Sequence, residues 1–539
     1  MRLGAALLLG LLFAAHVVVF GWRSITFDRR ITGDSMNYID VARNLSAGEG
    51  LVQSAAGYNQ PTFWERDFSP DFPAKTRAGH NPGYSVLIAA VAAGAGLEHA
   101  DAAFLLGAAS YGAAVAFAFV FARRLLGTAA GLLAAAFLAH QLRWIFLRVW
   151  TEPIMIACLL GMLAVLARPA TPARAVAAGL IAGAALLVRG GMLPLLALGG
   201  LACLLGPGPR IRLLPAFGAG ASIALAAPLA GEGQVYPPQT TAAASWFPHV
   251  SLGELGAAFL ERTGWELTAL ALLATLAWRR ARRDGEAFIP PEAATGLFLA
   301  AAWIGGWWVF LFAARMRVLT DTFDDRMLAP GGAVLAIAHA LLLWRALPRP
   351  SRQGTAVAVF AGAMLVFTAG DAVVLGEGSR TQRIYASPAR LLVGRNVTAR
   401  ALPPDGNRSD FARWIRTSPR RLWVGRNVTP RDLVVAAGAM DLPYFFRQQV
   451  PAAVSFSPYP YFARVSGTRF NAVFRARCGR HDNSYLILSR LPRAWGGFAR
   501  NLVSGAPAPP GSPAADFARV ADLPDAVVFR FTACNRPDR

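Results

Sequence analysis

The chain has 539 residues, of which 55% are hydrophobic and only 16% are charged, and its mean hydropathy is +0.40. Soluble domains usually carry about 25% charged residues, so this composition excludes an ordinary soluble protein, and the high apolar content excludes a disordered one. The net charge of +22 comes almost entirely from arginine, since Lys75 is the one lysine. Much of that arginine falls in short loops between apolar runs, as the positive-inside rule requires of a membrane protein, so the charge does not indicate nucleic-acid binding.

The first 375 residues contain a series of apolar runs that predict membrane-spanning helices. The first run has no small-residue cleavage site after it, so we expect a signal anchor. One of the runs 83–97, 103–122 and 128–147 is expected not to cross, and 83–97 is the best candidate because a span needs about 20 residues. We therefore predict an α-helical polytopic membrane protein with roughly 11 transmembrane helices. The runs lie near residues 3–21, 83–97, 103–122, 128–147, 151–167, 175–188, 191–206, 213–229, 263–279, 293–313, 327–345 and 355–375.

The arginine-rich loops alternate along the chain and set the expected orientation. Cytoplasmic loops are predicted near 168–174, 210–212, 278–283 and 345–352. The opposite, external side then holds Glu152, Arg189, the loops 22–82, 230–262 and 314–326, and everything after about residue 376.

Beyond residue 375 the composition of the sequence changes: the apolar runs become shorter, and Pro, Arg, Asp and Ser become more frequent. We divide the chain into a transmembrane module, 1–375, with the external loop 22–82, and an extracytoplasmic soluble domain of mixed α/β type, 376–539. Short strands are expected at 422–424 and 472–474. Cys478 and Cys534 both lie in this region and could form a disulfide if it is extracytoplasmic.

Two segments close to the first run carry polar groups that suit chemistry at the membrane surface. Asp34 opens a short segment expected to form a helix along the interface, where a carboxylate can accept a proton from an attacking hydroxyl. An Asp that only caps a surface helix would look the same. His80 stands before a Pro-Gly pair that predicts a sharp turn into the next apolar run. This histidine could contact a phosphate or an acceptor, or be an ordinary interfacial residue.

Further polar groups follow on the expected external side. Glu152 opens an apolar run, with Thr151 as a predicted cap and Pro153 in the first turn. Its carboxylate could complement the helix dipole or be functional. Arginines also gather where the positive-inside rule disfavours them, and guanidinium groups bind phosphate oxygens in a bidentate fork. Local pairing with the aspartates at 321–325 would explain some of them equally well. These arginines are Arg189, Arg315, Arg317 and Arg326.

Together these segments resemble the GT-C glycosyltransferases. The resemblance rests on Asp-x-x-x-Tyr-x-x-x-Ala-Arg-Asn-Leu from Asp34, His-x-Pro-Gly-Tyr from His80 and Thr-Glu-Pro from Thr151. It covers about residues 1–350 and is nearest to the bacterial relatives of protein O-mannosyltransferases and of the lipid A aminoarabinose and galacturonic acid transferases. The resemblance implies a GT-C type fold and transfer of a sugar from a polyprenyl-phosphate donor, usually with inversion at the anomeric carbon.

The resemblance also implies roles for individual residues. Asp34 corresponds to the general base, and Glu152 to a second acidic residue of the catalytic site. Donor-phosphate contacts fall on His80, Arg189, Arg315, Arg317 and Arg326, with Arg326 the best candidate. Tyr38, Asn81 and Tyr84 are acceptor-loop candidates. Because the first loop has no Asp-x-Asp, we expect no metal, and no other cofactor is implied.

The sequence therefore predicts a membrane glycosyltransferase that modifies a cell-envelope glycan, lipid or protein on the periplasmic face of a bacterial inner membrane. Two other classes remain open. One is a lipid-linked saccharide transporter or flippase, although the charges gather at one face rather than at membrane depth. The other is a non-catalytic envelope assembly factor, for which Asp34 and Glu152 would be dispensable.

Overall fold

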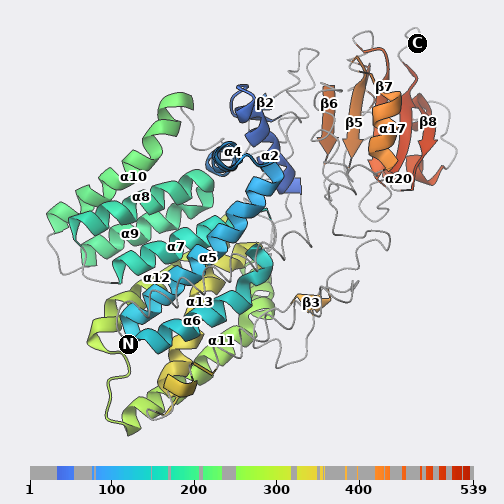
Figure 1. Ribbon diagram of the computed structural model, residues 1–539. Coiled ribbons are helices and arrows are strands. Elements are labelled where there is room, and N and C mark those ends of the chain that lie inside the picture. Colours follow the sequence, from blue (N-terminus) through green and yellow to red (C-terminus); the bar gives the residue numbers. More distant parts are fainter. Residues whose placement is uncertain are drawn as a thin grey trace.

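The computed structural model describes most of the first 348 residues and shorter stretches beyond them. Helices α5 to α13 form one bundle (Figure 1). The described residues before 349 are 33–53, 76–77, 81–146, 149–167, 171–205, 210–232, 251–316 and 325–348; after that, they are stretches between 353 and 533. The bundle consists of α5 (His99–Leu126), α6 (Thr128–Phe146), α7 (Glu152–Leu166), α8 (Pro172–Val188), α9 (Leu193–Leu205), α10 (Arg210–Glu232), α11 (Leu252–Arg283), α12 (Pro291–Met316) and α13 (Asp325–Ala346).

Local signals in the sequence set several of these helix starts. The Glu98 carboxylate accepts from the Ala100 amide at 2.7 Å at the start of α5. The Thr171 hydroxyl accepts from the Arg174 amide at 3.3 Å in α8. Side-chain oxygens at these positions satisfy amide groups that have no partner inside the helix. Apolar faces of α5, α6, α7 and α13 then pack into one continuous core.

The start of α11 corrects a sequence prediction. Residues 230–262 were expected to form a loop, but α11 begins at Leu252. Ser251 and Glu254 form a reciprocal capping box there, with the Glu254 amide donating to the Ser251 hydroxyl at 3.2 Å. Glu254, Glu261 and Arg262 make this first part of the helix polar, so an apolar-run criterion does not detect it.

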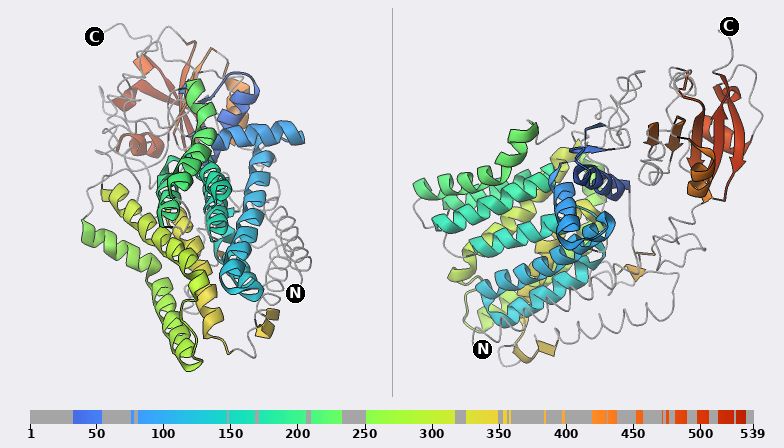
Figure 2. Two further views of the ribbon diagram at one scale, coloured as in Figure 1. Left: turned by 90° about the vertical axis from the view of Figure 1, so that its left-hand side faces the viewer. Right: turned by 45° about the horizontal axis from the view of Figure 1, so that its top comes forward.

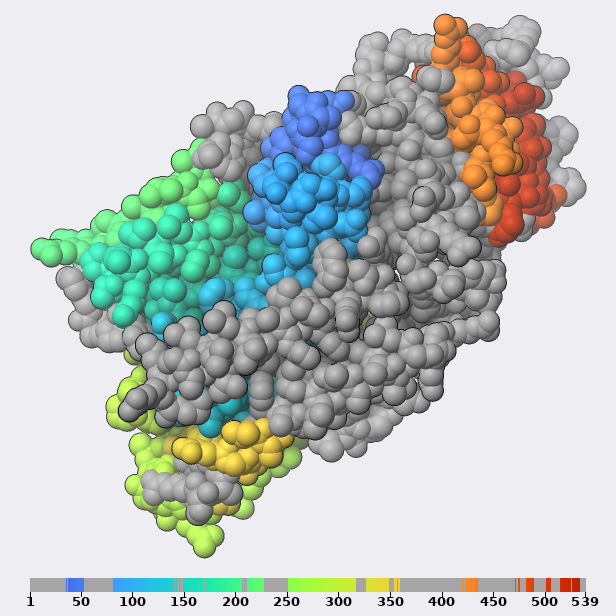
Figure 3. Space-filling model, viewed as in Figure 1, coloured from blue at the N-terminus to red at the C-terminus, as the bar shows by residue number. Residues whose placement is uncertain are grey.

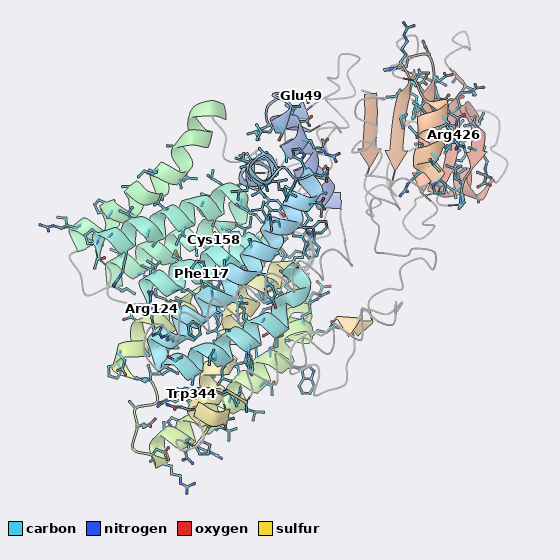
Figure 4. All side chains as sticks on the ribbon, viewed as in Figure 1. Glu49, Phe117, Arg124, Cys158, Trp344 and Arg426 are labelled. Carbon is cyan, nitrogen blue, oxygen red and sulfur yellow. The ribbon has the colours of Figure 1, made fainter. Side chains whose placement is uncertain are left out.

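The bundle has two distinct ends. At the first, which we call the arginine end, Arg124 of α5 donates to the Ala164 carbonyl of α7, and Arg345 of α13 pairs with Glu286 at 2.7 Å. Figure 4 shows Arg124 and Trp344 toward this end and Glu49, just after α2, at the opposite one. We call the opposite end the α2 end. The arginine end carries the loops that the sequence predicts to be cytoplasmic.

Among the described residues, α5, α12 and the stretch Arg326–Ala346 are long and apolar enough to cross a membrane by length and composition. Helix α4 (Gly83–Ala95) has 13 residues and is therefore about 20 Å long. It is seen end-on in Figure 1 and runs across α5 in the left view of Figure 2. This arrangement favours the prediction that run 83–97 does not cross, while the total number of crossings stays a prediction.

The described C-terminal residues contain a five-stranded mixed sheet with the order β6-β5-β7-β9-β8. Its central strand β7 pairs in parallel with β5 and antiparallel with β9, and β8 forms the far edge beside β9. The strands are β5 (Leu433–Ala437), β6 (Ala452–Phe456), β7 (Ser484–Ser489), β8 (Phe517–Asp522) and β9 (Ala526–Phe531).

Both strand predictions in this region are wrong. Residues 422–424 belong to helix α17 (Pro419–Asn427), where Trp423 packs edge-on against Tyr485 of β7. Phe474 is helical and contacts Phe517 and Phe531, while 472–473 lie outside the described residues. Three-residue apolar runs are too short to distinguish a helical period from a strand period. Cys478 and Cys534 also lie outside the described residues.

Candidate functional site

Helix α2 (Gly33–Ser46) lies beside α4 at the surface of the α2 end (Figure 3). The Ser35 hydroxyl donates to the Val149 carbonyl at 2.8 Å, and the Ser85 hydroxyl donates to the Tyr38 carbonyl at 3.0 Å. These buried bonds tie α2 to α4 and to the segment before α7. The predicted helix after Asp34 is therefore present and firmly placed.

Asp34 is the second residue of the described part of α2, so it lies within the first turn. Its side chain is outside the described residues, as are all of His80 and Arg317. Asn37 and Tyr38 follow Asp34 by three and four residues, which puts them on the same helix face. The role of Asp34 as a base stays a prediction.

Glu152 forms a buried ion pair with Arg189. Glu152 is the first residue of α7 and is 2% exposed, whereas the Arg189 side chain, just after α8, is 28% exposed. Arg189 Nη1 donates to Glu152 Oε1 and, at 3.2 Å, to the Thr151 hydroxyl. The Thr151 hydroxyl donates to Glu152 Oε2 at 3.3 Å. Because both Glu152 oxygens are engaged, this geometry suits an anchor for Arg189 better than a proton acceptor.

The same contacts overturn the predicted cap at Thr151. Thr151 precedes α7, but its side chain makes no capping hydrogen bond. Its hydroxyl is engaged with Glu152 and Arg189 instead. The hydrogen bond from Arg189, 38 residues away in the chain, thus takes the place of the local capping bond that the sequence predicts.

Arg326 reaches the same segment from α13. Its guanidinium carbon lies 4.9 Å from the centre of the Trp150 ring. The next residue, Met327, has its sulfur 3.7 Å from Arg189 Nη2. Consecutive residues 150–152 thus hold two guanidinium groups close together, Arg326 on the ring and Arg189 on the polar side chains. Stacked or carboxylate-held guanidinium groups suit recognition of phosphate oxygens.

Two tryptophans of α12 hold the first turns of α13. Trp307 Nε1 donates to the Met327 carbonyl at 2.9 Å, and Trp303 Nε1 donates to the Pro330 carbonyl at 3.2 Å. Their rings stack at 5.3 Å between centroids. Pro330 has no amide hydrogen to donate to the carbonyl four residues before it, so the first turn of α13 lacks one helical hydrogen bond. The two indoles secure this turn from α12. Sequence reasoning missed this contact, although the four-residue spacing of the tryptophans and the proline inside the next apolar run were visible.

Arg315 lies in the last turn of α12 and is 2% exposed. It belongs to the α2 end by its position in the helix, since α12 and α13 run in opposite senses between the two ends. The structure brings Glu152, Arg189 and Arg326 together at residues 150–152, and the phosphate-binding role of Arg315 stays a prediction.

The start of α4 is pressed against the end of α8. Asn81 Nδ2 donates to the Leu186 carbonyl at 2.7 Å. A Cβ at Gly83 would lie 2.7 Å from the Leu187 carbonyl carbon, so only glycine permits this approach. The predicted turn before α4 therefore serves to seat it next to Arg189. Asn81 acts here as a structural bridge.

Tyr38 and Tyr84 meet between α2 and α4. Their rings are edge-on with centroids 5.0 Å apart, and both are buried. Tyr84 lies in the first turn of α4, outside the candidate spanning helices. Burial raises the pKa of the Tyr84 hydroxyl, and the neighbouring charges of Tyr38 and Glu152 raise it further. The hydroxyl therefore stays protonated and lies within the electrostatic reach of Glu152.

The fold can now be compared with known proteins. The chain matches the crystal structure of ArnT from Cupriavidus metallidurans bound to undecaprenyl phosphate, with a TM-score of 0.55 and 14% identity over 98% of this chain and 99% of that one. The crystal structure of that protein in the apo state matches with the same TM-score and identity, over 99% of this chain and 100% of the other. The crystal structure of an oligosaccharyltransferase from Archaeoglobus fulgidus in the apo form matches with a TM-score of 0.46 and 12% identity. That match covers 90% of this chain and 69% of the other.

By sequence, no family model matches the chain, and no curated protein matches it. The structural match nevertheless spans nearly the whole chain. The chain has the fold of the GT-C membrane glycosyltransferases, as the sequence motifs predict.

Proposed function

We propose that this protein is an inverting glycosyltransferase that moves a sugar from a polyprenyl-phosphate donor to a cell-envelope glycan, lipid or protein. The observation that carries the proposal is the convergence of Arg189 and Arg326 on residues 150–152, at the end of the bundle where α2 lies. The likeness in fold to ArnT, which has been crystallised with undecaprenyl phosphate, supports a lipid-phosphate ligand for these arginines.

In this proposal the acceptor hydroxyl attacks the anomeric carbon of the donor. Asp34 takes the hydroxyl proton as the new carbon–oxygen bond forms. The bond between the anomeric carbon and the phosphate oxygen breaks, and the lipid phosphate leaves with that electron pair. Attack from the face opposite the leaving group inverts the anomeric centre.

The arginines stabilise the negative charge that develops on the leaving phosphate. Arg326 and Arg189 are the first choices because their positions are fixed by Trp150, Thr151 and Glu152. Glu152 then acts as a positioning residue that keeps Arg189 in place. His80, Arg315 and Arg317 remain further candidates for the donor phosphate, and Tyr38, Asn81 and Tyr84 for the acceptor side.

The proposed setting is the external face of a bacterial inner membrane. The arginine end carries the basic loops, so the positive-inside rule assigns it to the cytoplasm and the α2 end to the periplasm. A donor lipid in the bilayer would then present its phosphate at the level of Arg189 and Arg326. The 376–539 region, proposed as a separate extracytoplasmic domain, would lie on the acceptor side.

The test is transfer of radiolabelled sugar by purified protein from a panel of polyprenyl-phosphate sugars to envelope extract. The Asp34→Asn variant should lose about 10²- to 10⁴-fold in kcat, the usual contribution of a positioned base. The matched control is Glu292→Gln, an exposed carboxylate at the arginine end, which should transfer at the wild-type rate.

Other outcomes would reject the proposal. Equal transfer by wild type and Asp34→Asn would remove Asp34 as the base. Absence of transfer with every donor, together with movement of labelled lipid between leaflets by the protein in liposomes, would favour the flippase. Envelope assembly that is intact in cells carrying Asp34→Asn would favour the non-catalytic assembly factor.

A further inference from the structure

Two buried polar groups on α2 and α4 are enclosed by the protein without satisfying their hydrogen-bonding capacity. Among the residues that the structure describes, the Tyr84 hydroxyl and the Asn37 side-chain nitrogen have no hydrogen-bond partner. Tyr84 is 1% exposed and Asn37 is 7% exposed. Buried polar groups are almost always hydrogen-bonded, so each exception needs a reason.

Both groups belong to the seam between α2 and α4. Asn37 adjoins Tyr38, whose ring meets the Tyr84 ring at 5.0 Å. Helical spacing puts Asn37 and Tyr38 on the same face as Asp34, one turn further along α2. Tyr84 is also within electrostatic reach of Glu152. The two unsatisfied groups therefore border the proposed site rather than lying elsewhere in the core.

The chemistry of the two groups is specific. An amide NH₂ is a donor, and a protonated phenol is both donor and acceptor, and neither is charged. They suit an uncharged hydroxyl, whereas a phosphate is better bound by Arg189, just after α8, and Arg326 of α13. A site built for a substrate hydroxyl leaves its own polar groups unpaired when that substrate is absent.

We propose that Asn37 and Tyr84 form a hydroxyl-binding subsite next to Asp34, which holds a hydroxyl of the transferred sugar or of the acceptor. This inference rests on the proposed function and adds to it the chemical class of group that is recognised between α2 and α4. It assigns substrate selectivity to this seam and phosphate binding to the arginines.

The test compares buried side chains that differ in hydrogen bonding. The Tyr111 hydroxyl, buried in α5, donates to the Ala139 carbonyl at 2.7 Å. Removing a satisfied group destabilises a protein, whereas removing a buried unsatisfied one is neutral or stabilising. Tyr111→Phe should therefore lower the Tm, while Tyr84→Phe and Asn37→Leu should leave it unchanged or raise it.

Transfer kinetics should show the opposite pattern for the tyrosines. Tyr84→Phe should lower kcat/KM about three- to tenfold, the effect of one lost hydrogen bond, while Tyr111→Phe transfers as wild type does. A rise in KM for the acceptor assigns the subsite to the acceptor hydroxyl, and a rise in KM for the sugar donor assigns it to the sugar. Stabilisation by undecaprenyl phosphate alone should be the same in Tyr84→Phe and wild type.

Two results would overturn the inference. The first is a Tyr84→Phe variant whose Tm falls as that of Tyr111→Phe does, and the second is wild-type kcat/KM in Tyr84→Phe. Either result in an active protein leaves the proposed function standing. A wild-type protein that is inactive with every donor in the panel would instead defeat the proposed function itself.

Discussion

The two ends of the helical bundle use arginine in different ways. At the arginine end, guanidinium groups bind backbone carbonyls and nearby acids where helices finish, as Arg124 does with Ala164 and Arg280 does with Asp284. Cations there also complement the helix dipoles. At the α2 end, Arg189 and Arg326 instead converge on one short segment, residues 150–152.

The contrast is sharpest where the interaction type is the same. Arg282 lies 5.6 Å from the Trp278 ring within a single helix, α11, whereas Arg326 lies 4.9 Å from Trp150 in a different part of the chain. The first stacking contact is available to any exposed helix with this spacing. The second requires α13 and the segment before α7 to be positioned together, so it indicates a site rather than a solvated surface.

Of the changes that compare the two ends, breaking the ion pair between Glu152 and Arg189 at the α2 end should have the largest effect on stability and transfer. Glu152→Ala should lower the free energy of unfolding by about 3 kcal/mol, the low end for a broken buried pair, since it leaves a guanidinium without its carboxylate. Transfer should fall as well, because Arg189 loses its anchor. Denaturant unfolding and transfer assays in detergent measure the two effects.

The control for this prediction is Glu286→Ala, which breaks the pair with Arg345 at the arginine end. It should destabilise the protein but leave transfer per folded molecule unchanged. Equal loss of transfer in both variants would mean that the Glu152 pair matters only for stability, and the distinction between the two ends would fail.

Sequence patterns predicted the local parts of this comparison. The apolar runs, the helix after Asp34, the start of α4 after Pro82 and the start of α7 at Glu152 all follow from short-range signals. The expected alternation of loops also grouped Glu152, Arg189 and Arg326 on one side, and the structure brings these three residues to the same segment.

The remaining features depend on contacts between distant parts of the chain. No local rule indicates that Arg189 takes the Thr151 hydroxyl from its capping role, or that Trp307 binds the Met327 carbonyl. Partners such as these become visible only when the helices are packed. The start of α11 is the exception, because its capping box is a local Ser-x-x-Glu signal that a search for apolar runs does not include.

Replacing each stacked arginine by lysine sharpens the comparison with a smaller change. Arg326→Lys keeps the charge but loses the planar fork and the ring contact. We expect KM for the polyprenyl-phosphate donor to rise about tenfold, which corresponds to about 1.4 kcal/mol of phosphate binding. Arg282→Lys, on Trp278, should leave this KM unchanged. Similar KM values for Arg326→Lys and wild type would exclude Arg326 from the phosphate site.

The smallest expected effect concerns the tryptophan that supports Arg326 indirectly. Trp307→Phe keeps an aromatic ring but removes the hydrogen bond to the Met327 carbonyl, which should cost about 1 kcal/mol of stability. Because the first turn of α13 is then held less firmly, KM for the donor should rise about twofold with kcat unchanged. Trp278→Phe at the arginine end is the matched control, since this exposed indole contacts Arg282 of its own helix and lies away from α13's first turn. A purely structural role for Trp307 predicts the loss of stability without the change in KM. The ratio of the donor KM of Trp307→Phe to that of wild type therefore decides whether α12 helps to position the phosphate-binding arginine.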